Sequence, residues 1–149
     1  MYTQKEQKVI DQAKAIIASK FSSTGPSISS ATAAKDFLIM EISSLEHEVF
    51  VIVHLTSQHT IIEVEQIFRG TIDGAGVYPR EVVKSALSRN SAAVIFAHNH
   101  PSGVAEPSNA DITITRKLKN ALGTVDIRVL DHLIIGGATA TSFAERGLL

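Results

Sequence analysis

The sequence predicts an α/β sandwich, in which helices flank a mixed β-sheet. Segments with the 3.6-residue period of a helix alternate with short runs dense in Val, Ile and Phe. One of these runs, AAVIFA at 92–97, is wholly apolar, as is typical of a strand buried on both faces. The 149 residues, of which 44% are hydrophobic and 19% charged, fit a single globular domain with a substantial core.

The first part of the chain is expected to be helical. Apolar residues recur on one side of a helix over residues 1–20 and again over about 31–43. Between them, SSTGPSISS at 22–30 has the Ser, Gly and Pro content of a loop or short linker. We therefore divide the chain into an N-terminal helix and linker at 1–30 and a domain at 31–149.

Within that domain, strands and helices alternate after an initial pair of strands. Gly70, Gly74 and Gly76 interrupt the strand pattern, and Pro79 is well placed to begin a helix. The predicted elements are a buried strand at 48–55, a hairpin connection SQHT at 57–60, a candidate edge strand at 61–69, a helix at 79–90, the strand at 92–97, a helix at about 109–122, a strand at 125–135, a turn at 136–137 and a short closing strand.

The composition excludes several classes of protein. The chain has no cysteine, so disulfides, thiolate metal ligands and a cysteine nucleophile are impossible. The 15 acidic and 14 basic residues give a net charge of −1, which provides no strong signal for nucleic-acid binding. The N-terminus lacks the apolar core of a signal peptide, and no run has the length of a membrane span. We expect a cytoplasmic protein, without a membrane partner, whose oligomeric state the sequence leaves open.

The stretch AHNHPSGVAEPSNAD at 97–111 is the most informative. His98 and His100 are two residues apart where the chain leaves a predicted strand, so both imidazoles would point to one side and Asn99 to the other. Ser108 and Asp111 lie three residues apart at the start of a predicted helix. Two histidines and a carboxylate form a common catalytic zinc shell with one position open for water.

Each of these pairs also has an ordinary structural interpretation. Two neighbouring histidines by themselves are more often loop or surface residues than metal ligands. Ser108 with Asp111 is equally a helix N-cap with an acid at N3. The two interpretations are compatible because a capped helix would hold Asp111 in place. The occurrence of all four residues directly after a buried strand favours a metal site.

At this point the sequence resembles a known family. The pattern His98-x-His100 followed by Ser108-x-x-Asp111 is similar to the motif of JAMM (MPN+, JAB-domain) metallopeptidases. The closer resemblance is to RadC-like bacterial proteins, in the short form that lacks a helix-hairpin-helix module. It covers roughly residues 31–149 and rests on HEVF at 47–50, VYPREVV at 77–83, AHNHPSG at 97–103, EPSNAD at 106–111, VLDHLIIG at 129–136 and SFAERG at 142–147.

The resemblance implies a three-layer, cytidine-deaminase-like JAB/MPN sandwich that binds Zn²⁺ through His98, His100 and Asp111. It further implies a metallopeptidase that cleaves a peptide or isopeptide bond in a peptide or protein substrate. In such enzymes a glutamate upstream is the acid/base, which matches Glu48, and the serine, here Ser108, helps to stabilise the tetrahedral intermediate.

Two features leave alternatives open. Glu46 has the same strand parity as Glu48, so spacing alone does not separate the two glutamates. Asn99 stands where the eukaryotic branch of the family has Ser or Thr, which leaves the substrate open rather than the metal. The alternative functions are a non-catalytic interaction module, or a DNA-repair-associated protein, on the same fold.

Other histidines carry weaker signals. Asp131 and His132 suggest a triad with Ser102 or Ser108, but structural roles are favoured, including orientation of a ligating imidazole by the aspartate. His47, His54 and His59 are expected to be surface or strand histidines. The tripeptide His-Asn-His matches an HNH nuclease by coincidence only, and a zinc deaminase is excluded because its ligands include cysteine.

Overall fold

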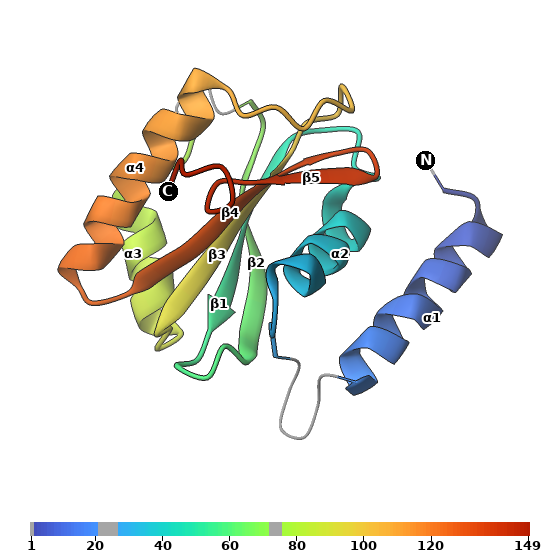
Figure 1. The fold of residues 1–149 in the computed structure, drawn as a ribbon, viewed down its shortest axis with the longest axis horizontal. Helices are drawn as coiled ribbons and strands as arrows, with labels where there is room; N and C mark the ends of the chain where they lie inside the picture. Colours follow the sequence, from blue (N-terminus) through green and yellow to red (C-terminus); the bar gives the residue numbers. More distant parts are fainter. Residues whose placement is uncertain (1, 21–26, 72–75) are drawn as a thin grey trace.

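The computed structural model describes residues 2–20, 27–71 and 76–149, and over these ranges the chain forms an α/β sandwich (Figure 1). A five-stranded mixed sheet lies between α3 and α4 on one face and α2 on the other. The elements are α1 (Gln4–Lys20), α2 (Ala31–Ile42), β1 (Val49–Leu55), β2 (Ile61–Arg69), α3 (Pro79–Ser88), β3 (Ala93–Asn99), α4 (Asn109–Thr124), β4 (Arg128–Gly136) and β5 (Thr139–Ser142). The predicted fold class is confirmed.

The strand order β2-β1-β3-β4-β5 places β3 at the centre of the sheet. β3 pairs antiparallel with β1 and parallel with β4, while β2 and β5 pair antiparallel at the two outer positions. The segment 61–69 is therefore an edge strand, as predicted. All seven residues of β3 are buried, which explains why this strand is apolar until it reaches the histidines.

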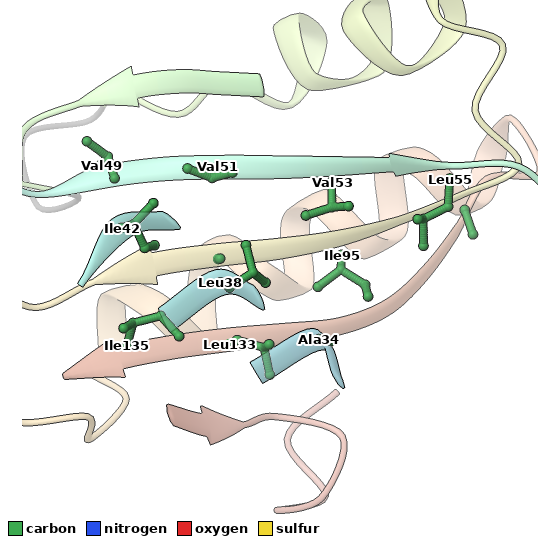
Figure 2. Packing of buried hydrophobic residues seen from close by; sticks show 12 residues of the cluster. Ala34, Leu38, Ile42, Val49, Val51, Val53, Leu55, Ile95, Leu133 and Ile135 are labelled. Carbon is green, nitrogen blue, oxygen red and sulfur yellow. The ribbon is translucent and has the colours of Figure 1, made fainter. Parts of the chain in front are cut away.

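The face of the sheet under α2, which we call the α2 face, holds one of two apolar clusters (Figure 2). Alternate residues of β1 and β3 point to this face and pack against Ala34, Leu38 and Ile42 of α2. Ser30 caps this helix, since its side chain accepts a hydrogen bond of 3.1 Å from the Ala33 N–H. α2 lies over β3, β4 and β5 on this face.

The opposite face, which we call the α3/α4 face, holds the second cluster. Phe50 and Phe96 lie at its centre with their ring centroids 5.4 Å apart, and Leu118 and Leu122 of α4 pack in the same cluster. His98 follows Phe96 by two residues and therefore points to the same face. The aromatic cluster thus packs directly against His98, since the Phe50 and His98 ring centroids are 6.3 Å apart.

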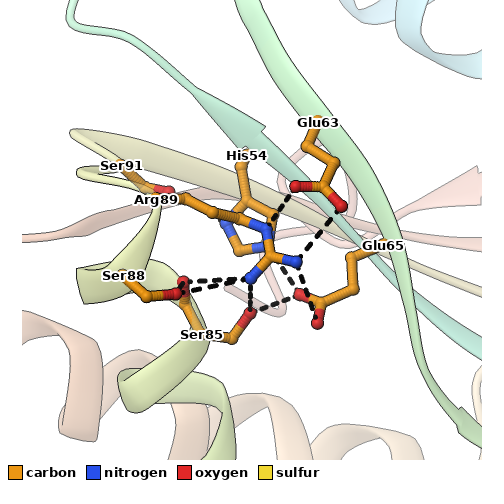
Figure 3. A network of polar contacts seen from close by, with 7 residues as sticks. All are labelled: His54, Glu63, Glu65, Ser85, Ser88, Arg89 and Ser91. Atoms are coloured by element: carbon orange, nitrogen blue, oxygen red, sulfur yellow. Dashed lines mark hydrogen bonds and ion pairs between the residues drawn. The ribbon is translucent and has the colours of Figure 1, made fainter.

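A polar network at the far end of β1 joins β1, β2 and α3 (Figure 3). His54 is fully buried, its Nδ1 lies 2.8 Å from the Ser91 hydroxyl, and its Nε2 lies 2.9 Å from a Glu65 carboxylate oxygen. Arg89 of the same network donates to Glu63 at 2.7 Å. His54 is thus a strand histidine, as expected, and it lies far from His98 along β1 and β3 because His54 pairs with Val94.

Several predicted boundaries differ from the structure by one to three residues, and two of the differences bear on the site. The strand predicted at 92–97 continues through His98 and Asn99, because both residues pair in register with Ile134 and Ile135 of β4. The strand predicted at 125–135 begins only at Arg128, because α4 runs to Thr124 and Asp126 then adopts a positive φ of 59° in the turn. His98 therefore has a rigid strand backbone.

The N-terminal prediction is only partly covered. α1 occupies most of the predicted helix at 1–20 and is joined to α2 by an ion pair of 3.1 Å between Lys14 and Glu41. Of the predicted linker at 22–30, residues 22–26 lie outside the described residues, as does Gly74 farther along the chain. Among the described helices, none is long and apolar enough to cross a membrane.

Candidate metal centre

The two motif histidines lie where β3 ends. His98 belongs to the strand and His100 follows it, and their ring centroids are 5.0 Å apart. The Asn99 side chain points to the α2 face, where its amide hydrogen-bonds to backbone groups ahead of and at the start of β1. The sequence expectation that Asn99 points away from the histidines is therefore correct.

Backbone carbonyls orient both imidazoles. Nδ1 of His98 lies 3.0 Å from the Val49 carbonyl oxygen, and Nδ1 of His100 lies 2.9 Å from the Val104 carbonyl oxygen. A carbonyl can only accept, so each Nδ1 carries the proton and donates it. Each neutral ring therefore presents an Nε2 lone pair, which is the arrangement that metal-bound histidines show.

Asp111 lies in the first turn of α4, where Ser108 is the N-cap. The Ser108 hydroxyl accepts from the Asp111 N–H at 3.0 Å, and the Asp111 carboxylate accepts from the Ser108 N–H at 2.8 Å. This reciprocal capping box is the structural interpretation predicted from the sequence. The same contacts fix a carboxylate that is only 1% exposed and faces the histidines.

The three side chains converge on one point. Each offers a ligand atom, and these atoms all lie within 4.8 Å of one another. Nε2 of His100 is 3.3 Å from one Asp111 carboxylate oxygen, and Nε2 of His98 is 4.0 Å from the other. Three N and O donors at these separations could hold a small divalent cation without rearrangement of the backbone.

The charges of this cluster follow from burial and mutual contact. Burial lowers the pKa of His98, which keeps this imidazole neutral. The hydrogen bond to Asp111 raises the pKa of His100. Burial raises the pKa of Asp111, but the hydrogen bonds from His100 and Ser108 outweigh it and bring that pKa down to about 2. Asp111 is therefore an anion at neutral pH.

Glu48, which directly precedes β1, is the fourth candidate residue of the site. A pocket of about 260 Å³ is lined by Glu48, Thr71, His98, His100, Pro101, Ser102, Ser108 and Asp111. Oε2 of Glu48 is buried and finds no hydrogen-bond partner among the described residues. A buried carboxylate oxygen without a partner is costly, which points to a ligand or substrate group that engages it. Glu46, the alternative, is exposed and is not one of the lining residues.

Asp131 has a structural role, as favoured from the sequence, but it does not orient a ligating imidazole. Its carboxylate accepts from the Ser142 hydroxyl at 2.5 Å and from the N–H groups of His132 and Ala144 at 2.7 and 3.0 Å. These contacts tie the end of the chain to β4. The orientation of His98 and His100 instead comes from main-chain carbonyls, which no side-chain pattern in a sequence can reveal.

The His132 side chain lies on the α3/α4 face of the sheet, whereas the Asp131 side chain points to the opposite face. Its ring is fully buried against Phe143, with centroids 4.7 Å apart, and its Nδ1 is 2.5 Å from the Thr115 hydroxyl of α4. Burial lowers the pKa of His132 to about 3. It does not line the pocket with Ser102 or Ser108, so the described residues do not form a triad there.

The protein is thus an α/β domain with a candidate metal centre at the end of its central strand. The family model for the RadC-like JAB domain matches residues 28–148. A UPF0758 protein of Marinobacter nauticus is 58% identical over 125 residues, which are 84% of this chain and 56% of that protein. The chain belongs to the RadC-like JAB domain family.

Two further relatives show how much of a longer protein the chain can represent. A UPF0758 protein of Methylibium petroleiphilum is 52% identical over 141 residues, which are 95% of this chain but 63% of that protein. One of Vibrio cholerae is 49% identical over 144 residues, which are 97% of this chain and 90% of that protein. The chain thus spans little more than half of the Marinobacter relative and most of the Vibrio one.

Proposed function

We propose that this chain is a zinc-dependent hydrolase that cleaves peptide or isopeptide bonds. The observation that carries the proposal is the convergence of three ligand atoms, all within 4.8 Å of one another, in the pocket that Glu48 also lines. Membership of the RadC-like JAB domain family supports a metal-dependent hydrolase, and two imidazoles with one carboxylate are a donor set common at catalytic zinc sites. Two neutral imidazoles and one carboxylate leave a fourth tetrahedral position free.

The residues fit a bound zinc ion in three respects. Because Nδ1 of each ring donates to a carbonyl, the neutral form of each histidine presents its Nε2 lone pair to the cluster, and His100 releases the Nε2 proton that it shares with Asp111 when a metal binds. The Asp111 carboxylate is anionic and held by a capping box. The orphaned Oε2 of Glu48 lies in the same pocket but is not one of the three clustered ligands, so it is available for proton transfer.

When bound, zinc would polarise the scissile carbonyl and lower the pKa of its bound water to about 7. Glu48 would accept the proton of the attacking water and return it to the leaving amine. It directly precedes β1, beside the strand that carries His98, and it lines the same pocket as that histidine. We assign this role to Glu48 rather than Glu46, because Glu48 lines the pocket while Glu46 is exposed and does not.

Ser108 can cap α4 and assist catalysis at the same time. As a cap it uses an oxygen lone pair, because its hydroxyl accepts from the Asp111 N–H. The hydroxyl proton remains free to donate into the pocket that Ser108 lines. Ser108 would therefore donate to the oxyanion as charge develops on the substrate carbonyl.

The metal part of the proposal is tested by analysis of the purified protein. Protein prepared without chelators or added metal should contain about one zinc per chain by mass spectrometry, and His98→Ala should contain almost none. His47→Ala is the matched control, because the His47 side chain is not among the pocket lining or the clustered ligands. Wild-type protein free of metal after such handling would contradict the proposal.

The hydrolytic part needs a substrate panel of linear peptides and lysine-isopeptide conjugates. Glu48→Gln should keep its zinc and lose turnover by about 10²-fold or more, as is usual for loss of a general acid/base. Glu46→Gln should behave like wild type, since its side chain is exposed. A wild-type protein that holds zinc but cleaves nothing on the panel would favour a non-catalytic interaction module.

A further inference from the structure

Asn99 lies between the two histidines but takes no part in the metal cluster. Its side chain points to the α2 face, and the residue is only 2% exposed. A buried amide must satisfy its polar atoms, and Asn99 satisfies them on main-chain groups of one short segment, residues 45–49. That segment carries Glu48.

Three hydrogen bonds make the connection. Oδ1 of Asn99 accepts from the Val49 N–H at 2.7 Å, and Nδ2 donates to the carbonyl oxygens of His47 at 3.0 Å and Leu45 at 3.4 Å. The side chain therefore holds the main chain on both sides of Glu48. Its first bond lies beyond the last register pair of β1 and β3, between Phe50 and His98, so it extends the pairing of these strands by one more contact.

Glu48 is held at its main chain but not at its side chain. Its carbonyl oxygen accepts from the Gly70 N–H at 2.9 Å, while its Oε2 has no partner within the described ranges. Val49, the next residue, donates to Asn99 and accepts from His98. Two residues of β3 thus hold the main chain next to Glu48, Asn99 on the α2 face and His98 on the α3/α4 face. These contacts determine where the Glu48 carboxylate lies in the pocket.

We propose that Asn99 is a positioning residue for Glu48, and that this is the reason for an asparagine between the two histidines. The inference rests on the proposed function, because it assigns Asn99 a role in proton transfer through Glu48. A serine at this position could not replace it, since one hydroxyl on a shorter side chain cannot reach Val49, His47 and Leu45 together. Asn99 therefore acts on the geometry of the site from the face opposite to the substrate.

The test compares three variants of the full chain. Asn99→Leu removes all three bonds with little change in volume, and Asn99→Asp keeps the acceptor for Val49 but loses both donors. The matched control is Ser91→Ala, which removes a buried hydrogen bond to His54 at the other end of β1. Ser91 is 7% exposed, so the control probes general loss of stability without touching the pocket.

The first readout is hydrogen exchange of the Gly70 amide, which reports the Glu48 main chain and is not itself bonded to Asn99. In Asn99→Leu its protection should fall at least tenfold further than in Ser91→Ala, and in Asn99→Asp by an intermediate factor. The zinc Kd should stay within about threefold of wild type in all three variants. Unchanged Gly70 protection in Asn99→Leu would overturn the inference whether or not the protein is a hydrolase.

The second readout is kinetic, on whichever panel substrate the wild type cleaves. Asn99→Leu should lower kcat by ten- to a hundredfold with KM nearly constant, since a displacement near 1 Å at a catalytic group costs roughly that much. In the Glu48→Gln background the same substitution should lower kcat by less than threefold. An equal loss in both backgrounds would show that Asn99 does not act through Glu48. A wild type inactive on every substrate, with Gly70 protection still lost in Asn99→Leu, would refute the proposed function and support the positioning of Glu48.

Discussion

Gly136 offers a sharp test of how the candidate metal site is supported, because a single methyl group added there would meet main-chain atoms. The residue ends β4, beside the loop that follows His100. A Cβ at Gly136 would lie 2.5 Å from the Ala105 nitrogen and 2.7 Å from the Val104 carbonyl carbon. Ordinary contact begins at 3.4 Å, so the loop backbone would have to retreat by about 0.9 Å.

That retreat would break the contact that orients His100. The Val104 carbonyl oxygen accepts from His100 Nδ1 at 2.9 Å, and a shift of this size takes the pair beyond hydrogen-bonding range. Loss of such a partner typically weakens metal binding by about 10- to 100-fold. Gly136→Ala should therefore raise the zinc Kd by that factor, equivalent to about 1.4–2.7 kcal/mol of binding free energy.

Competition titration against a chromophoric zinc chelator measures this change directly. The matched control is Gly123→Ala near the end of α4, where an added Cβ meets no atom of the described residues within 4 Å. The control should bind zinc like wild type and be more stable by about 0.5–1 kcal/mol, because alanine favours the helix. A folded Gly136→Ala protein with wild-type zinc affinity would refute the role assigned to the Val104 carbonyl.

Three further predictions concern pH and the N-terminus. Contact with Asp111 raises the pKa of His100 above its usual 6.5 in the metal-free protein. Zinc affinity should therefore rise about tenfold per pH unit up to that pKa and then level off. Zinc titrations between pH 5.5 and 8.5 measure this change, and a flat profile would contradict the prediction. Burial lowers the pKa of His54 below 6.5, so unfolding at lower pH is accompanied by proton uptake. The free energy of unfolding should therefore be highest above pH 6.5 and decline as the pH falls towards the folded pKa. Urea unfolding should show this decline, and the decline should be smaller in His54→Gln. Deletion of residues 1–26 should leave the zinc content unchanged, because the matched domain begins at residue 28 and the clustered ligands lie in 98–111. A truncated chain that folds but has lost its zinc would show that α1 supports the site.

The architecture was predictable because it depends on periodicity. The apolar run at 92–97 marks the central strand, and the alternation of strands and helices around it defines a mixed sheet with helices on both faces. The boundaries were less predictable. Pairing with β4 extends β3 through Asn99, which depends on contacts far apart in the sequence. A positive φ at Asp126 delays the start of β4, which depends on the geometry of one turn.

The candidate site divides in the same way. His98, His100 and Asp111 could be singled out because strand parity and a helix start bring them together over a short stretch of sequence. The carbonyls of Val49 and Val104 could not, since every residue has a carbonyl and only the fold decides which one meets an imidazole. Asn99 was predicted to point away from the histidines, but its contacts with residues 45–49 required the register of β1 against β3.

The location of the clustered side chains has a consequence for the newly made protein. His98, His100 and Asp111 belong to one continuous strand–loop–helix segment, whereas Glu48 directly precedes β1 and is separated from that segment by a hairpin and a helix. Closing a short loop costs less entropy than pairing distant strands, so the first three groups can assemble while the sheet is incomplete. On the proposed function, an incompletely folded chain would hold its ion only weakly, because Val49 of β1 has not yet oriented His98, and it would cleave nothing until β1 docks and brings Glu48 to the pocket.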